Sequence, residues 1–284
     1  MTTPMQMTQV LRHADRRTRI RAKSRSGQAG PRPRILLTND DGITSPGLHA
    51  AYLELKRLGS VTIVAPDAER SAVGHAITTL TPLRVKEFSS GRRRMGYAVS
   101  GMPADCVKIA ISSLLKEPPD LVVSGINLGP NTGTNVLYSG TVSAATEARI
   151  LGIPSMAVSL GTFTDPEWAV AARLTRRIAA VVLERGLPQK VLLNVNVPNL
   201  PRGKIKGVKV TRMGSSGYVD EFTLRTDPGN EPYYWLTATY KTTDTDQDTD
   251  AAALKAGWVT ITPVTFDLTA YDVLDDIAAW KVKL

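Results

Sequence analysis

The architecture of this chain can be read outward from residues 35–42, ILLTNDDG. Ile35-Leu36-Leu37-Thr38 is a short apolar and β-branched run, typical of a buried strand. The strand is expected to end at Asn39, and two adjacent carboxylates and a glycine come directly after it. In open parallel sheets, functional groups gather outside the carboxyl ends of the strands. The segment therefore predicts both a buried parallel strand and a site at its end.

Short strands and helices alternate along the next 160 residues. Ser45-Pro46 is typical of a helix start, and we expect that helix over 48–58, stopped by Gly59. Further strands are expected at 61–65, 121–124, 155–158 and 191–195, and further helices at 103–115, 141–151 and 166–185. This alternation predicts an α/β fold, a Rossmann-like three-layer structure with a mostly parallel sheet covered on both faces.

The pattern changes after Pro198. We expect strands at 205–211 and 233–240 with polar connections, an acidic segment at 242–250 and a last helix near 270–281. These features predict a C-terminal antiparallel appendage over about 201–284, after a core over about 34–200.

The formal net charge of +9 lies almost entirely in the first residues. Residues 1–34 hold nine Lys and Arg and one acid, which leaves 26 basic and 25 acidic residues in the rest of the chain. Blocks of like charge usually stay disordered and bind polyanions weakly. We therefore expect residues 1–33 to be a basic, disordered leader and the folded body to be nearly neutral. A functional arm is the alternative.

Composition excludes several classes of protein. An apolar fraction of 42% and a charged fraction of 21% are ordinary for a globular protein. No apolar run approaches the ~18–20 residues of a membrane span, and no apolar core of a secretion signal is present. Cys106, the single cysteine, cannot form an internal disulfide. The sequence predicts a cytoplasmic protein without a membrane contact.

The paired carboxylates of Asp40 and Asp41 predict a metal site. Two adjacent carboxylates repel each other, and a divalent cation removes that cost. Hard oxygen ligands suit Mg²⁺, Mn²⁺ or Ca²⁺. The alternative is an ordinary Asn-Asp-Asp-Gly turn, which these residue types also favour.

Three other loops come after predicted strands and are expected at the same edge of the sheet. They are Pro66–Ser71, the Gly- and Asn-rich stretch 125–133, and Tyr138–Val142 just before a helix. A Gly-containing turn at a helix N-terminus presents backbone N–H groups to an anion, typically phosphate, and the Ser139 and Thr141 hydroxyls could add donors. A plain helix cap is the alternative for this last loop.

Several enzyme classes lack their motifs here. No P-loop, dinucleotide-binding glycine fingerprint, zinc-protease helix or nucleophile elbow occurs. With three histidines in the chain, a histidine-built metal centre is excluded. His75 is the one candidate site histidine, with a structural role as the favoured alternative.

These blocks together resemble the SurE family, the stationary-phase survival nucleotidases. The similarity is carried by ILLTNDDG, VAPDAERSAVGHAIT, VSGMPADCVKIAI, PDLVVSGINLGPNTGTNVLYSGTVSAATEA and LLNVNVP, with later segments at DPGNEPYYWL and DTDAAALKAGWVTITPVTFDLT. It extends from about residue 34 to about 270. The resemblance implies a Rossmann-like, metal-dependent phosphomonoesterase that acts on nucleoside monophosphates, with a C-terminal arm used in dimerisation.

The resemblance also implies site residues. The family's metal ligands match Asp40, Asp41, Ser71 and Asn127, and its phosphate-facing loop matches Ser139-Gly140-Thr141-Val142. We expect the substrate to be bound by Asn39, Asn131, Ser139, Gly140 and Thr141. The expected cofactor is one divalent cation, Mg²⁺ or Mn²⁺, and the expected assembly is a homodimer or homotetramer.

The resulting hypothesis is phosphomonoester hydrolysis by metal-assisted attack of water. The metal would neutralise phosphoryl oxygens and lower the pKa of its bound water, and Asp40 or Asp41 would orient that water. One alternative is a broader phosphatase that also acts on short polyphosphate or sugar phosphates. The other is a nucleic-acid-binding protein with a vestigial site, although nucleic acid is expected to make at most weak contact with the basic leader.

Overall fold

The computed structural model describes residues 32–282 except residues 92, 242–243 and 245. Two compact units divide at Arg32, and the larger one, Pro33–Leu284, contains the sheet and the candidate site. The predicted leader lies outside the described residues apart from its last two positions. Pro33 belongs to the larger unit, where its carbonyl accepts a 2.9 Å hydrogen bond from the Ser60 N–H.

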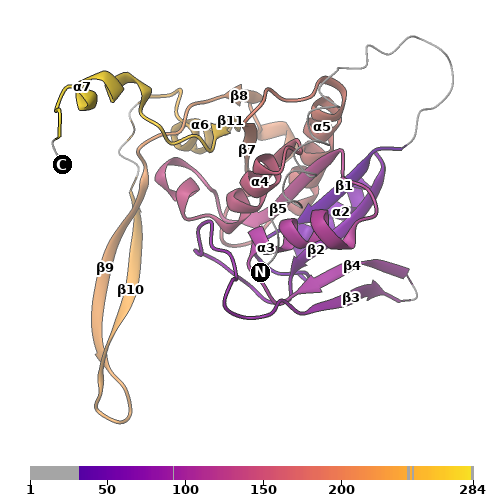
Figure 1. The fold of residues 1–284 in the computed structure, drawn as a ribbon, viewed down its shortest axis with the longest axis horizontal. Helices are drawn as coiled ribbons and strands as arrows, with labels where there is room; N and C mark the ends of the chain where they lie inside the picture. Colours follow the sequence, from indigo (N-terminus) through magenta and orange to yellow (C-terminus); the bar gives the residue numbers. More distant parts are fainter. Residues whose placement is uncertain (1–31, 92, 242–243, 245, 283–284) are drawn as a thin grey trace. The chain divides into compact units, whose positions relative to one another are not determined.

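A nine-stranded sheet forms the centre of this unit (Figure 1), in the order β3-β4-β2-β1-β5-β6-β7-β11-β8. Neighbouring strands from β4 to β7 are parallel, β3 and β11 run antiparallel to β4 and β7, and β8 is parallel to β11. The mostly parallel sheet predicted from the sequence is confirmed. The strands are β1 (Arg34–Thr38), β2 (Ser60–Pro66), β3 (Val85–Ser90), β4 (Arg93–Val99), β5 (Leu121–Leu128), β6 (Ser155–Gly161), β7 (Val191–Pro198), β8 (Val208–Val210) and β11 (Val259–Thr265).

The order of the parallel strands fixes where a site can form. Numbered along the chain, the six strands β1, β2, β4, β5, β6 and β7 lie in the order 3-2-1-4-5-6. The direction of winding reverses between β1 and β5. Ligands of such sheets bind in the crevice outside the carboxyl ends of the strands at this reversal. The end of β1 carries Asp40, and the end of β5 carries Asn127.

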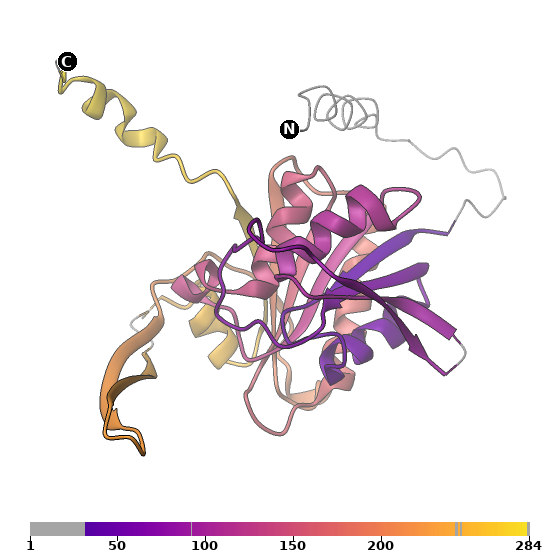
Figure 2. The ribbon, with the colours of Figure 1, turned by 60° about the horizontal axis from the view of Figure 1, so that its bottom comes forward.

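Helices cover both faces of the sheet (Figure 2). They are α2 (Pro46–Leu55), α3 (Pro103–Ile109), α4 (Gly140–Ile150) and α5 (Trp168–Arg185). Because side chains alternate along a strand, Ile35 and Leu37 of β1 pack in one core with α2 and α5, whereas Leu36 packs in another with α3 and α4. Since α4 and α5 lie on opposite faces, the β5–α4–β6 and β6–α5–β7 crossovers have opposite hands.

Several predicted boundaries are wrong. α2 begins at Pro46, as the Ser45-Pro46 signal predicts, but it ends at Leu55 and not at residue 58. The predicted helix 103–115 is α-helical only to Ile109 and continues as a π-helix, Ala110–Leu114. β5 continues to Leu128 through a stretch predicted to be a loop, because Asn127 and Leu128 pair with β6 beyond an irregularity that begins at Ser124. The elements β3, β4, β11 and α6 (Asp250–Lys255) are absent from the sequence prediction.

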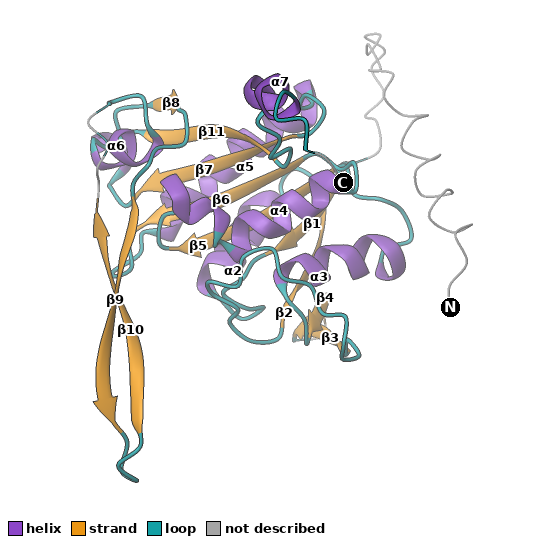
Figure 3. Ribbon diagram, turned by 60° about the vertical axis from the view of Figure 1, so that its left-hand side comes forward, coloured by secondary structure: helices purple, strands orange, loops and turns teal. Residues whose placement is uncertain are grey.

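Only part of the C-terminal segment is an antiparallel appendage. β9 (Gly217–Thr226) and β10 (Pro232–Lys241) form a separate two-stranded sheet (Figure 3), whereas β8 and β11 extend the main sheet. The predicted last helix is present as a 3₁₀ turn, Tyr271–Val273, and α7 (Leu274–Ala278). Within the described part of the chain, no helix is long and apolar enough to cross a bilayer.

Candidate functional site

Asp40 lies where three loops meet at the carboxyl edge of the sheet. Asp40 is only 4% exposed and lies directly beyond the end of β1. The backbone N–H of Arg70, from the loop after β2, donates to the Asp40 carbonyl at 2.8 Å. The hydroxyl of Thr141, in the first turn of α4, donates to the Asp40 carboxylate. Asp40 therefore joins the ends of β1 and β2 to the N-terminus of α4.

The close approach of Asp40 to α4 requires a glycine at position 140. A Cβ on Gly140 would lie 2.8 Å from the Asp40 Cβ and 2.9 Å from its Oδ2. Atoms do not approach so closely without a shift of the backbone. The glycine of the Ser-Gly-Thr loop thus serves the contact between the carboxylate and the helix N-terminus, whose dipole favours a negative charge.

Asp41 is the second carboxylate of the pair. Its Oδ2 accepts a 3.3 Å hydrogen bond from the Leu128 N–H at the end of β5, which places it across the reversal point of the sheet. Burial, and then the charges of Asp40 and Glu69, raise the pKa of Asp41 to about 7 despite that hydrogen bond. Burial also raises the pKa of Asp40, against the hydrogen bonds from Thr141. Neither carboxylate forms an ion pair with any described residue.

Ser71 and Asn127 lie in the chain segments that contact this pair, Ser71 next to Arg70 and Asn127 next to Leu128. The Ser71 hydroxyl donates to Glu69 Oε1 at 2.6 Å, one residue beyond the contact between Arg70 and Asp40. The Asn127 amide nitrogen donates to the carbonyl of Gly129 at 2.8 Å and that of Leu128 at 3.3 Å. These hydrogen bonds use the protons of both side chains and leave oxygen lone pairs for another partner.

Ser139 caps the helix that faces Asp40. Its hydroxyl accepts from the Val142 N–H at 3.1 Å, as the plain-cap alternative requires. The Thr141 hydroxyl is directed at Asp40, so its proton is already used. The structure therefore brings Gly140 and Thr141 to Asp40, directly after the cap residue Ser139.

Two predicted substrate residues have other partners. The Asn39 amide nitrogen donates to the Gly42 carbonyl and the Ser45 hydroxyl, both at 2.9 Å, and so holds the turn that leads into α2. Asn131 is buried, and its amide nitrogen donates to Ser159 at 2.8 Å. Its backbone is held by Asn194 and Asn196 of β7. The contacts of Asn131 connect strand ends.

His75 has the structural role that the sequence favoured. Its Nε2 lies 2.9 Å from Oε2 of the buried Glu147 on α4, and Lys108 on α3 donates to the other oxygen at 2.8 Å. Burial opposes the ionisation of Glu147, but these two partners outweigh it and lower the pKa of Glu147. Glu147, Glu69 and the Leu128 N–H were not predicted from the sequence. Glu69 belongs to the loop Pro66–Ser71 and could have been found there, whereas Leu128 contributes only backbone.

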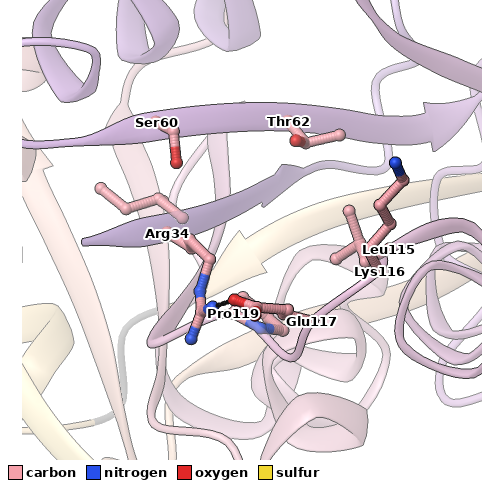
Figure 4. A pocket seen from close by; sticks show the side chains of 8 residues that line it. Arg34, Ser60, Thr62, Leu115, Lys116, Glu117 and Pro119 are labelled. Carbon is pink, nitrogen blue, oxygen red and sulfur yellow. Dashed lines mark ion pairs between the residues drawn. The ribbon is translucent and has the colours of Figure 1, made fainter. Parts of the chain in front are cut away.

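A pocket of about 260 Å³ lies at the other end of β1 and β2 (Figure 4). Arg34 and Ser60, which begin these strands, line it together with Thr62 and residues 115–117 and 119. Arg34 is paired with Glu117 and Asp120, which neutralise its charge locally. None of the candidate site residues lines this pocket.

The fold and the site define a doubly wound α/β protein with an acidic centre at the reversal of its sheet, beside a helix N-terminus. The family described as Survival protein SurE matches residues 35–220. This chain belongs to the SurE family.

Relatives that the chain matches over nearly their whole length support this family membership. The chain is 50% identical over 249 residues to the 5′-nucleotidase SurE of Syntrophobacter fumaroxidans, covering 88% of this chain and all of the relative. It is 50% identical over 247 residues to the 5′-nucleotidase SurE of Moorella thermoacetica, covering 87% and 95%. The crystal structure of the SurE protein from Aquifex aeolicus superposes with a TM-score of 0.78 at 42% identity, covering 88% of this chain and all of that one.

Proposed function

We propose that this chain is a 5′-nucleotidase that hydrolyses nucleoside 5′-monophosphates to nucleoside and phosphate with one divalent cation, Mg²⁺ or Mn²⁺. The enzyme class follows from the family and from relatives named 5′-nucleotidase at about half identity. The observation that carries the mechanism is the pair of mostly buried, uncompensated carboxylates beside the N-terminus of α4.

The donor set fits a hard cation. Asp40 and Asp41 lack a cationic partner among the described residues, and Glu69 adds a further negative charge nearby. The described residues hold no group of three His, Cys, Asp or Glu side chains that could bind a metal. The remaining ligands are then the neutral oxygens of Ser71 and Asn127, which together with carboxylates suit Mg²⁺ or Mn²⁺ better than Zn²⁺. When bound, the cation supplies charge neutralisation for the phosphoryl group and lowers the pKa of water.

The chain's own residues bind the substrate and move the proton. The Gly140 N–H at the start of α4 and the Ser139 hydroxyl hold the phosphoryl oxygens and stabilise the charge that develops on them. Thr141 fixes Asp40, whereas only one oxygen of Asp41 accepts a hydrogen bond from a described residue. The other Asp41 oxygen orients the attacking water and takes its proton. The water oxygen bonds to phosphorus, the phosphorus–ester oxygen bond breaks, and the leaving nucleoside oxygen takes a proton from solvent.

The C-terminal arm supports the proposed homodimer or homotetramer. The two-stranded sheet of β9 and β10 exposes Phe222, Leu224, Trp235 and Leu236. An isolated two-stranded hairpin is only marginally stable in water, and an apolar surface of this kind is typical of an interface. A second copy of the chain is the proposed cover for this surface. The cytoplasmic location stays a prediction.

Activity of the purified full chain against a panel of substrates and metals tests the proposal. AMP, 3′-AMP, a short polyphosphate and ribose 5-phosphate are each assayed after chelation and then with Mg²⁺, Mn²⁺, Ca²⁺ or Zn²⁺. We expect no turnover after chelation and recovery of AMP hydrolysis with Mg²⁺ or Mn²⁺. Full turnover after exhaustive chelation contradicts the role of the metal. Hydrolysis of polyphosphate or ribose 5-phosphate without nucleotides contradicts the proposed substrate class.

A further inference from the structure

An exposed aromatic side chain lies beside the acidic centre. Phe163, in the loop directly after β6, is 60% exposed. Because β5 and β6 are parallel neighbours, the loops after them leave the same edge of the sheet (Figure 3). A phenyl ring that remains largely in water gains little from folding.

The position of the ring is fixed by its contact with Gly129. A Cβ on Gly129 would lie 2.2 Å from Cε1 and 2.8 Å from Cζ of the Phe163 ring, so the ring packs directly against the glycine backbone. The Gly129 N–H donates to the Leu160 carbonyl at 3.1 Å, which ties this point to the end of β6. One side of the ring is thus supported by backbone while the residue stays mostly exposed.

The backbone of Leu128 and Gly129 also holds two of the candidate metal ligands. The Leu128 N–H donates to Asp41, and the Gly129 carbonyl accepts from the Asn127 amide. The phenyl ring, Asp41 and Asn127 therefore all converge on Leu128–Gly129. The Leu128 side chain is itself 36% exposed and adds apolar surface at this point.

We propose that Phe163 is the platform on which the nucleobase of the substrate stacks. This proposal rests on the proposed function, because it takes the phosphoryl group to lie between the carboxylate pair and the N-terminus of α4. A nucleoside carries its base one sugar away from the phosphate, and the supported ring lies one step along the backbone from the contact with Asp41. Stacking on an aromatic ring tolerates every base, because every base has a π face. Phe163 then makes the site prefer nucleotides over phosphomonoesters without a base.

The kinetics of Phe163→Ala with matched substrates test this proposal in the full chain. AMP carries a base, and ribose 5-phosphate is the same ester without one. We expect Phe163→Ala to raise KM for AMP about ten-fold, which is the order of effect of one lost base–aromatic stack. The kcat for AMP, and both kcat and KM for ribose 5-phosphate, should stay nearly unchanged. Phe163→Trp should restore the wild-type KM for AMP. Adenosine should inhibit competitively, with its Ki raised by the same factor in Phe163→Ala.

Ile150→Ala is the matched control. Ile150 is also an exposed apolar side chain, but it lies at the far end of α4, and its removal should leave both KM values unchanged. If Phe163→Ala leaves KM for AMP unchanged, or raises KM for both substrates equally, the stacking platform is wrong while AMP hydrolysis stands. A wild-type enzyme that hydrolyses no nucleotide contradicts the proposed function, and the platform with it.

Discussion

The raised pKa of Asp41 makes the stability of the metal-free protein depend on pH. Burial, and then the neighbouring charge of Asp40, raise the pKa of the Asp41 carboxyl group from 3.8 to about 7. Between these two pH values the folded, metal-free protein binds more protons than the unfolded chain. The free energy of unfolding of the metal-free protein therefore falls as pH rises from 3.8 to about 7.

Asp41→Asn should separate stability from activity. The amide removes the repulsion, so the metal-free variant should unfold at a higher temperature than wild type at pH 7, by an amount that shrinks toward pH 4. Its turnover of AMP should fall by at least about a hundredfold, because a charged ligand and the proton acceptor are lost. Calorimetry at several pH values and steady-state kinetics measure the two effects. Near-wild-type turnover would contradict the catalytic role of Asp41 and would favour the alternative that Asp40 and Asp41 only form an ordinary turn.

Gly140→Ala should disrupt the site by sterics alone. The added methyl would lie 2.8 Å from the Asp40 Cβ, so either Asp40 or the first turn of α4 must move. We expect AMP turnover to fall by at least about tenfold, since displacement by a fraction of an ångström weakens a preorganised site. Gly203→Ala is the control, because a Cβ there meets no atom within 4 Å. Equal activity of the two variants would show that the contact between Asp40 and α4 is dispensable.

The segment after β2, which carries Ser71, is held against α4 and the turn before it by three contacts. The carbonyl of Gly74 accepts from Ser143 at 2.7 Å, its N–H donates to the Tyr138 carbonyl at 3.0 Å, and His75 is paired with Glu147. All three contacts join the segment that carries Ser71 to α4 or to the turn before it. The segment and the helix N-terminus are thus held as one unit.

Glu147→Gln should loosen that unit. Glu147 is buried, and its lowered pKa means that its stabilisation is present above the unfolded pKa of 4.5 and is lost as pH falls below it. The variant should lose about 1–3 kcal/mol of unfolding free energy at pH 7, and the difference from wild type should shrink below pH 4.5. Urea unfolding at pH 7 and pH 4 measures this. Glu184→Gln, at an exposed position of α5, should change stability little at either pH.

The elements that can be predicted from sequence are those with a strong local signal. β1 and the start of α2 are predictable because an apolar run, a cap and a proline mark them, and the Ser45 hydroxyl does accept from the Leu48 N–H. β3 and β4 escape prediction because their charged and polar residues suit an edge hairpin that is half in water. The end of β5 escapes it because its strand character comes from pairing with β6, which no local signal reports.

The site is predictable only where side chains carry the chemistry. Asp40, Asp41, Ser71 and Asn127 are proposed as metal ligands from the resemblance and from their places near strand ends. The contribution of the Leu128 N–H and the contacts of Asn131 to β7 depend on tertiary neighbours, so the sequence could not reveal them. Phe163 lies in a loop without a motif, and its contact with Gly129, from which its proposed role is argued, appears only in the structure.

For the whole molecule, the basic leader should be dispensable for mononucleotides. The candidate site is built from residues 39–141, which lie in the larger unit, and exposed charge is screened over about 8 Å at physiological ionic strength. Deleting residues 1–32, which keeps the Pro33 contact to Ser60, should leave AMP turnover within about twofold. Binding of a longer polyanion, measured at low and physiological salt, is where an effect is expected. A large loss of AMP turnover in a folded deletion variant would place the leader in the active site.

The carboxylate pair at the reversal of the sheet is proposed to hold a divalent cation, and the function depends on that cation. Equilibrium binding of Mn²⁺ to the full chain, measured by electron paramagnetic resonance, tests this without reference to turnover. We predict one Mn²⁺ per chain in wild type, displaced by Mg²⁺, and loss of that binding in Asp41→Asn while its circular dichroism stays unchanged. Unaltered Mn²⁺ binding in Asp41→Asn, or a wild-type chain that binds none, would contradict the proposed metal site.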